Sequence, residues 1–152
     1  MPASDMPLVS IVIPTYNHRR YVCDAVDSAL NQTYPNCEVI VIDDGSTDGT
    51  GEMLRERYGD RIRYVYQDNR GLPAARNAGT RHACGVYVNY CDADDQLLPE
   101  KIARCVEVFA EHPDAGAVYT DYESVAEDGR TILLRSHPVL PSGNIFCELL
   151  IG

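Results

Sequence analysis

The sequence VYVNYCDADD at residues 86–95 organises both the fold and the function that we expect for this chain. Residues 86–90 alternate and are rich in β-branched and aromatic side chains, which predicts a strand, and three carboxylates follow it. Carboxylates this close repel one another and lose solvation when buried, and a divalent cation relieves both costs. Mg²⁺ and Mn²⁺ take carboxylate, phosphate and water oxygens as ligands. The stretch therefore indicates a metal-bridged phosphate site at a strand end, and the alternative is a turn in which Asp92 or Asp95 only caps the next helix.

The composition is that of an acidic globular domain. The 152 residues are enough for one domain with a single core, and 45% hydrophobic with 24% charged residues is ordinary. The net charge of −10 argues against a nucleic-acid partner, because no basic stripe could neutralise a phosphate backbone. No apolar run approaches the roughly 20 residues that cross a bilayer, so we expect no membrane span. Scattered cysteines without a CxxC pair, and no signal peptide, predict a cytoplasmic protein that could meet the inner membrane face only through parts outside this chain.

Two nearly continuous apolar runs, LVSIVIP at residues 8–14 and EVIVI at residues 38–42, predict strands that are buried on both faces. Such strands belong to parallel sheets that helices cover. Segments with helical spacing of apolar residues alternate with the strands along the chain. We expect further strands at residues 61–66, 86–90, 115–125 and 131–134, the last two joined by a turn at 127–130, and helices at residues 21–30, 53–58, 71–83, 102–109 and 144–151. This order predicts an α/β fold with an open, mixed, mostly parallel sheet and helices on both faces.

Polar residues follow three of the predicted strands. Tyr16 and Asn17 follow the first strand, Asp43 and Asp44 the second, and the acids of residues 92–95 the fourth. In open α/β sheets, ligands bind beyond the carboxyl ends of the strands, where the strand order reverses. The convergence of acids and an aromatic residue on one rim favours the metal and phosphate site over the capping alternative.

Four segments carry a resemblance to a known family. They are VSIVIPTYN at residues 9–17, VIDDGSTD at 41–48, GLPAARNAG at 71–79 and DADD at 92–95. In this order and strand context, they resemble the family 2 inverting glycosyltransferases of GT-A fold, a Rossmann-like α/β architecture. The resemblance covers residues 7–122. The length predicts one domain over residues 1–152, and the resemblance makes it a nucleotide-sugar-binding domain, the N-terminal donor-binding portion of a glycosyltransferase. The amphipathic segment at 144–151, which ends at Gly152, predicts that the protein continues beyond this chain.

The resemblance implies a donor, an acceptor and a cofactor. The donor is a nucleoside-diphosphate sugar, with UDP favoured, and the acceptor is a hydroxyl of a saccharide or glycoconjugate, as in polysaccharide synthesis. Mn²⁺ or Mg²⁺ would stabilise the leaving diphosphate as a Lewis acid. The resemblance makes Asp94 the main metal ligand and places Asp92 against the ribose or against the metal and its water shell. The catalytic general base is expected beyond Gly152, so we do not assign Asp121 or Glu123 to it.

The resemblance also assigns residues to the nucleotide. Asp44 would accept a hydrogen bond from the base, and Pro14 and Tyr16 would line the base pocket. Arg76 would contact the diphosphate, for which a guanidinium group suits the geometry. The alternatives are an ordinary core position for Tyr16 and a helix-surface ion pair for Arg76. Asp43 is expected to be structural, with a hydrogen bond to the turn that follows it.

The chain lacks the motifs of two other classes of nucleotide-binding α/β protein. A dinucleotide-dependent oxidoreductase needs GxGxxG after the first strand, where this chain has PTYN at residues 14–17, and no GxxxxGK[ST] segment indicates a P-loop NTPase. The remaining alternative is a non-catalytic module that lacks the general base and serves nucleotide-sugar binding or interaction. Nucleotide binding that depends on Asp94 would favour the donor site, and the absence of any nucleotide binding would favour the module.

Overall fold

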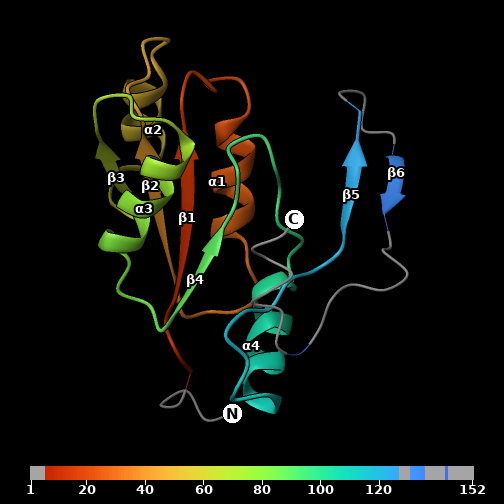
Figure 1. Cartoon of the computed structure of the whole chain (residues 1–152). Helices are drawn as coiled ribbons and strands as arrows, with labels where there is room; N and C mark the ends of the chain where they lie inside the picture. Colours follow the sequence, from red (N-terminus) through yellow and green to blue (C-terminus); the bar gives the residue numbers. More distant parts are fainter. Residues whose placement is uncertain (1–5, 127–130, 136–142, 144–152) are drawn as a thin grey trace. The chain divides into compact units, whose positions relative to one another are not determined.

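The computed structural model describes residues 6–126, 131–135 and 143 of the chain (Figure 1). The chain divides into two compact units, residues 1–104 and residues 105–152, and the boundary falls within helix α4 (Lys101–Glu111). The single domain expected for residues 1–152 stays a prediction. The expected turn at 127–130 and the expected helix at 144–151 lie outside the described residues.

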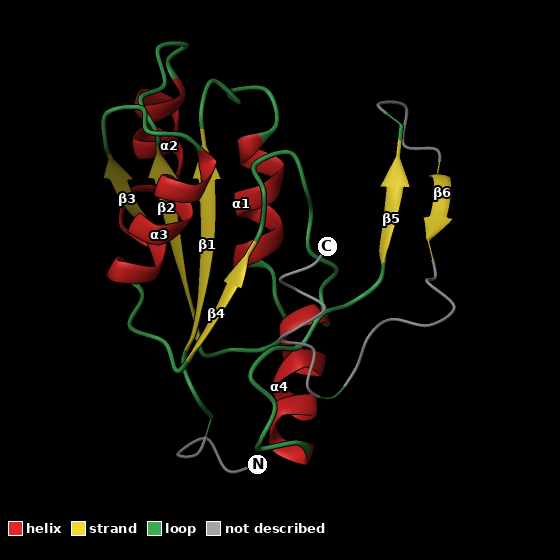
Figure 2. Cartoon of the chain, viewed as in Figure 1, coloured by secondary structure: helices red, strands yellow, loops and turns green. Residues whose placement is uncertain are grey.

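The first unit is built on a four-stranded sheet, whose arrows all point the same way in Figure 2. Its strands are β1 (Val9–Thr15), β2 (Cys37–Asp43), β3 (Arg63–Tyr66) and β4 (Tyr87–Tyr90), in the order β3-β2-β1-β4. All neighbouring pairs are parallel. The chain runs from β1 outward to β3 and then crosses to the other side of β1 to form β4. The strand order therefore reverses between β1 and β4, and the predicted α/β fold is confirmed.

Helix α3 (Leu72–His82) covers one face of this sheet. The small side chains of Ala75 and Ala78 pack against apolar side chains of β1 and β2, including that of Val12. The approach is closer still at Gly79, because a Cβ atom there would overlap the Val12 side chain. The run of small residues in this segment thus serves close packing of a helix on the sheet, as its composition predicts.

Helices α1 (Val22–Leu30) and α2 (Thr50–Tyr58) cover the opposite face (Figure 1). Successive side chains of a strand point to opposite faces, and the neighbours Ile11 and Val12 are both fully buried, so both faces of β1 are covered. The hydroxyl of Tyr58 donates a hydrogen bond of 3.0 Å to a backbone carbonyl of α1 and ties the two helices together. The strand predicted to be buried on both faces is confirmed.

At the amino edge of the sheet, Glu38 of β2 fixes the chain just before β4 begins. Its Oε1 accepts hydrogen bonds from Ser10 Oγ at 2.6 Å and from the N–H of Cys84 at 2.7 Å. The N–H of Gly85 donates to Ser10 Oγ at 2.8 Å. A Cβ atom at Gly85 would lie only 2.6 Å from the backbone nitrogen of Ser10, so glycine permits this close approach. These contacts set the position from which β4 runs beside β1.

The second unit contains a two-stranded antiparallel sheet of β5 (Tyr122–Val125) and β6 (Thr131–Arg135). The hairpin partner expected at 131–134 is confirmed. The strand expected at 115–125 is wrong over residues 115–121, which are not in a strand and are mostly exposed. A strand needs a hydrogen-bonding partner, and β6 pairs with β5 only from Tyr122 onward. In the described part of the chain no helix exceeds 11 residues, and none could cross a bilayer.

Candidate functional site

The carboxyl edge of the four-stranded sheet carries the predicted site residues. The strand register aligns Thr15 of β1 with Asp43 of β2, so Tyr16 and Asp44 leave adjoining strands at the same level. On the other side of β1, strand β4 ends and the acids of residues 92–95 follow. The reversal of strand order lies between β1 and β4. It is therefore flanked by Tyr16 on one side and by the acids on the other.

The segment 92–95, called the acidic turn below, holds three carboxylates in four residues. The N–H of Asp95 closes the turn by donating to the carbonyl of Asp92 at 3.0 Å, and Asp94 is exposed. Burial raises the pKa of Asp95, and the neighbouring Asp94 and Asp92 raise it further. Negative charge is therefore concentrated here. Helix capping by this turn is wrong, because α4 begins at Lys101, six residues after Asp95.

Two of the predicted site residues contact each other. Nη2 of Arg76 donates to Oδ1 of Asp92 at 2.6 Å, and both side chains are 39% exposed. Arg76 thus forms an ion pair, but with the acidic turn rather than with a neighbour on its own helix. Its guanidinium carbon also lies 5.9 Å from the centre of the Tyr90 ring. Its Nε is buried and has no hydrogen-bond partner among the described residues, so it could donate to an anionic ligand.

Asp44 lies at the same edge of the sheet but is only 3% exposed, and its carboxylate accepts hydrogen bonds from residues 67–71. Its Oδ1 accepts hydrogen bonds from Nε2 of Gln67 at 2.6 Å and from the N–H of Arg70 at 3.0 Å. Its Oδ2 accepts from the N–H of Gly71 at 2.8 Å. Gly71 has a φ of 83° and immediately precedes α3. The Asp44 carboxylate therefore holds segment 67–71, and its negative charge lies favourably at the N-terminus of α3.

Asp43 is structural, as the sequence predicts. Its Oδ1 accepts a hydrogen bond of 2.8 Å from the N–H of Ser46, in the turn that follows, and its Oδ2 accepts one of 2.6 Å from the hydroxyl of Tyr64. Burial raises the pKa of Tyr64, and the hydrogen bond to Asp43 adds to this shift. The side chain of Asp43 thereby joins β2, the following turn and β3.

The remaining predicted residues lie at the end of β1. Pro14 is buried within the strand, whereas Tyr16, two residues later, is 47% exposed. This exposure excludes the alternative that Tyr16 is an ordinary core aromatic residue. Between them, Oγ1 of Thr15 is buried without a hydrogen-bond partner among the described residues. An exposed ring and a buried polar atom without a partner thus lie at the reversal point of the sheet.

The acidic turn suits a particular mode of metal binding. Among the described residues, no three Asp, Glu, His or Cys side chains gather closely enough to hold a metal ion by themselves. Magnesium, however, is commonly held by one or two carboxylates together with phosphate oxygens of the substrate and water. The concentrated charge of the turn and the exposed Asp94 fit this mode. A protein cage that holds the ion without substrate does not fit.

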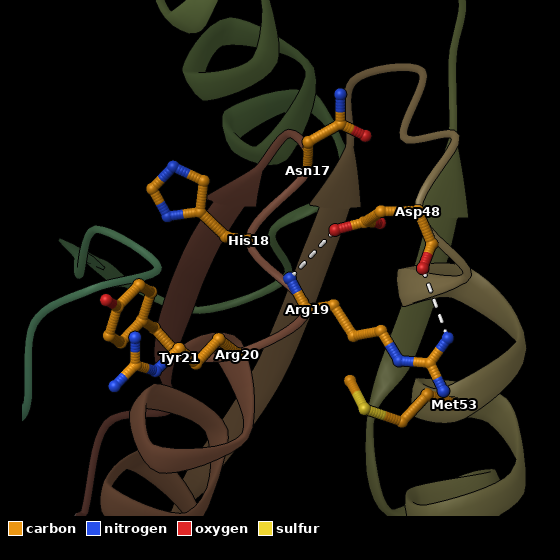
Figure 3. A pocket seen from close by; sticks show the side chains of 7 residues that line it. All are labelled: Asn17, His18, Arg19, Arg20, Tyr21, Asp48 and Met53. Atoms are coloured by element: carbon orange, nitrogen blue, oxygen red, sulfur yellow. Dashed lines mark hydrogen bonds between the residues drawn. The ribbon is translucent and has the colours of Figure 1, made fainter.

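A cavity that the sequence pattern did not point to opens at the same edge, between the β1–α1 and β2–α2 loops (Figure 3). It has a volume of about 530 Å³ and is lined by residues 17–21, Asp48 and Met53. We call it the loop cavity. Of the residues that line it, the sequence pattern predicts only Asn17 at the carboxyl edge of the sheet. The sequence signal that could have indicated it is the pair Arg19 and Arg20 in the loop after β1, in a chain whose net charge is −10.

Comparison with known proteins identifies the family. The model of the family described as glycosyl transferase family 2 matches residues 10–147. The chain belongs to this family. It is 40% identical to the chondroitin synthase of Escherichia coli over 129 residues, which are 84% of this chain and 19% of the synthase. It is 41% identical to the hyaluronan synthase of Pasteurella multocida over 129 residues, again 84% of this chain but 13% of that protein. The chain thus spans less than a fifth of the length of these two relatives.

Solved structures of glycosyltransferases confirm the GT-A fold. The S. aureus TarS structure in complex with UDP-GlcNAc has a TM-score of 0.62 and 30% identity, and the match covers 70% of this chain and 32% of that one. The mannosyltransferase PcManGT from Pyrobaculum calidifontis, in complex with GDP-Man and Mn²⁺, has a TM-score of 0.61 and 31% identity, over 68% of this chain and 32% of that one. Both are similar to the chain in fold and in sequence.

Proposed function

We propose that this chain is the donor-binding part of a glycosyltransferase that moves a sugar from a nucleoside-diphosphate sugar to a hydroxyl of a saccharide or glycoconjugate. UDP is the favoured nucleotide, transfer inverts the anomeric carbon, and the product belongs to polysaccharide or glycoconjugate synthesis. The observation that carries this proposal is the acidic turn beside Arg76 at the reversal point of the parallel sheet. The complexes of TarS with UDP-GlcNAc and of PcManGT with GDP-Man support a nucleotide sugar. The cytoplasmic location stays a prediction.

The chain's own residues would bind the diphosphate and the cation. Asp94 and Asp92 would hold Mn²⁺ or Mg²⁺, which supplies Lewis-acid stabilisation of the leaving diphosphate when bound. Arg76 would donate its partnerless Nε to a phosphate oxygen while its Nη2 stays on Asp92. Asp92 would then have two tasks, to bind the cation and to orient the guanidinium group.

The nucleobase and the sugar would lie on either side of the diphosphate and the cation. The exposed ring of Tyr16 offers a surface for stacking on the nucleobase, next to Pro14 at the end of β1. A contact from the base to Asp44 requires that one of the N–H donors of segment 67–71 gives way, because these donors already occupy both carboxylate oxygens. The general base for the acceptor hydroxyl is proposed to lie beyond Gly152.

Calorimetry with UDP and Mn²⁺ tests the proposal. We expect binding to the unaltered chain, loss of the Mn²⁺-dependent binding in Asp94→Ala, and retention in the control Asp60→Ala. Asp60 is exposed in the short helix that precedes β3, and its replacement removes the same charge. Circular dichroism establishes that both variants fold. Retained binding in Asp94→Ala would overturn the metal assignment, and failure of every nucleotide to bind the unaltered chain would favour the non-catalytic module.

A donor screen extends the same test. Thermal shift against a panel of nucleotide sugars, with and without Mn²⁺, is interpretable because a ligand of the native state raises its stability by mass action. Affinity for the metal should fall as the pH approaches about 4, where carboxylates bind protons. Affinity that stays flat to that pH would contradict carboxylate ligation.

A further inference from the structure

Tyr90, the last residue of β4, lies on the face of the sheet that α3 covers. Side chains of a strand alternate between the two faces, and Val88 packs on the α3 side, against the cluster that includes Ala75 and Ala78. Tyr90 is two residues further along the strand, so its side chain points to the same face. The residue is 43% exposed. Its ring is therefore available to polar side chains of α3 rather than to the core.

Two hydroxyl groups join Tyr90 to α3. The hydroxyl oxygen of Tyr90 lies 2.6 Å from Oγ1 of Thr80. Oγ1 of Thr80 also donates to the carbonyl of Arg76, four residues earlier in the helix, at 3.0 Å. A threonine hydroxyl has only one hydrogen to donate, so the Tyr90 hydroxyl is the donor in the shorter bond. These bonds restrain the Tyr90 ring beside the turn of α3 that carries Arg76.

The ring of Tyr90 also contacts the guanidinium group of Arg76. The guanidinium carbon lies 5.9 Å from the ring centre, within the range of a cation–π interaction. The same guanidinium group donates from Nη2 to Oδ1 of Asp92 at 2.6 Å. Both charged side chains are 39% exposed, and an ion pair as exposed as this contributes little by itself. The ring and the carboxylate thus restrain Arg76 together.

The ring and the carboxylate would respond differently to a bound cation. In the proposed site, Asp92 would share its carboxylate between the cation and Arg76, so its ion pair with the guanidinium group would weaken once the cation is bound. The Tyr90 ring carries no charge and takes no part in this competition. Its contact with Arg76 would therefore persist when the pair with Asp92 weakens.

We propose that Tyr90 is a positioning residue that holds Arg76 in place for the diphosphate of the nucleotide sugar. The ring would keep the guanidinium group beside the acidic turn. Nε of Arg76, which is buried and has no hydrogen-bond partner among the described residues, would then stay available to a phosphate oxygen. Tyr90 would act through Arg76, without touching the phosphate. The inference rests on the proposed function, because it assumes that a diphosphate binds at Arg76.

Calorimetric titration of the full 152-residue chain with UDP and Mn²⁺ tests this role. Tyr90→Leu removes the ring and should weaken binding by about 2- to 10-fold, the range of cation–π contacts between exposed and desolvated sites. Tyr90→Phe keeps the ring and should retain most of the affinity. Tyr21→Leu is the matched control and should leave binding unchanged. Tyr21 is 37% exposed, and the guanidinium carbon of Arg20 lies 5.3 Å from the centre of its ring.

A double-mutant cycle distinguishes positioning of Arg76 from a general disturbance of β4. Arg76→Gln alone should weaken UDP binding by about 10- to 100-fold, the effect of losing a hydrogen bond to a charged group. Tyr90→Leu added to Arg76→Gln should weaken it by less than about 2-fold more, because the side chain through which Tyr90 acts is then gone. If Tyr90 only supported the strand and the acidic turn, its loss would weaken binding equally in both backgrounds. Circular dichroism establishes that every variant folds.

Inorganic pyrophosphate with Mg²⁺, titrated in parallel, separates this inference from the proposed function. If UDP binding depends on Arg76, and Tyr90→Leu has no effect or an equal effect in both backgrounds, only the role of Tyr90 is wrong. If pyrophosphate binding depends on Arg76 and Tyr90 in the coupled manner, and UDP binds no more tightly than pyrophosphate, only the nucleotide assignment is wrong. If neither ligand binds, or if binding does not depend on Arg76, the inference is overturned together with the assignment of Arg76 to the diphosphate.

Discussion

Replacing Asp44 by Asn tests whether this carboxylate holds segment 67–71 against the sheet. Asp44 is 3% exposed, and its two oxygens accept hydrogen bonds of 2.6, 3.0 and 2.8 Å from Gln67, Arg70 and Gly71. Asparagine has nearly the same shape but only one acceptor oxygen. Its NH₂ group would face one of the two backbone N–H groups, which would then lack a partner. The substitution therefore changes hydrogen bonding and charge while it leaves packing almost intact.

The magnitude follows from these bonds. A hydrogen bond to a charged acceptor contributes about 1.5–3 kcal/mol, and a buried N–H group without an acceptor costs about 1–3 kcal/mol. The remaining oxygen keeps part of the interaction, so we expect the free energy of unfolding to fall by about 2–4 kcal/mol. For a chain of this size, that loss lowers the melting temperature by roughly 4–16 °C.

Urea unfolding followed by circular dichroism measures the loss in Asp44→Asn. Asp68→Asn is the matched control, because Asp68 is exposed in the same segment and its replacement removes the same charge. A change below about 0.5 kcal/mol in Asp44→Asn, the usual range for surface substitutions, would refute the structural role of the carboxylate. UDP titration of the folded variant then shows whether the base contact also depends on Asp44.

Three further predictions concern packing, pH and reactivity. Gly79→Ala should lower the free energy of unfolding by about 1–3 kcal/mol, because the added methyl group overlaps the side chain of Val12. Thermal unfolding measures the change, and a stabilised variant would contradict this packing. Burial opposes ionisation of Asp48, but hydrogen bonds from Thr50 and Arg19 outweigh it and lower its pKa in the folded state. The stabilising contribution of Asp48 is present above the usual carboxyl pKa of 3.8 and is lost as the pH falls through the lower folded value. Asp48→Asn should therefore cost about 1 kcal/mol in urea unfolding at pH 7 and less at pH 3, and an equal loss at both would exclude the charge as its cause. Burial, together with the neighbouring acids, raises the pKa of Cys91 to about 12. Iodoacetamide at pH 8 should therefore modify the exposed Cys84 and leave the buried Cys91 unmodified, as measured by mass spectrometry. Equal labelling of the two cysteines would show that Cys91 is accessible.

The core strands could be predicted because their sequence pattern is itself the consequence of burial. The apolar runs at 8–14 and 38–42 became β1 and β2, since a strand covered on both faces has no polar side to display. The run at 115–125 carries apolar residues too, yet only Tyr122–Val125 forms a strand. Whether such a run is paired depends on a partner elsewhere in the chain, which local composition does not reveal.

The features of the site that depend on side-chain type could be predicted from the sequence, whereas those that depend on hydrogen bonds of the backbone could not. Acids after strands β2 and β4 follow from residue type and strand order, and both groups lie at the carboxyl edge. The burial of Asp44 depends on N–H groups of Arg70 and Gly71, which every sequence contains and no pattern displays. The loop cavity likewise depends on hydrogen bonds between two loops about 30 residues apart, such as that from Arg19 to Asp48.

The contacts of Glu38 with Ser10 and Cys84 lie at the end of the sheet remote from the acidic turn. Because they fix the chain where β4 begins, we expect them to affect the direction in which the carboxylates after β4 point. Strand β4 has only four residues, so few hydrogen bonds with β1 hold its register. A shift of the register by one residue would turn every side chain of the strand to the opposite face of the sheet. We therefore expect inactivating substitutions at Glu38 as well as at the carboxyl edge. Such variants would retain Asp92 and Asp94 but orient their carboxylates wrongly.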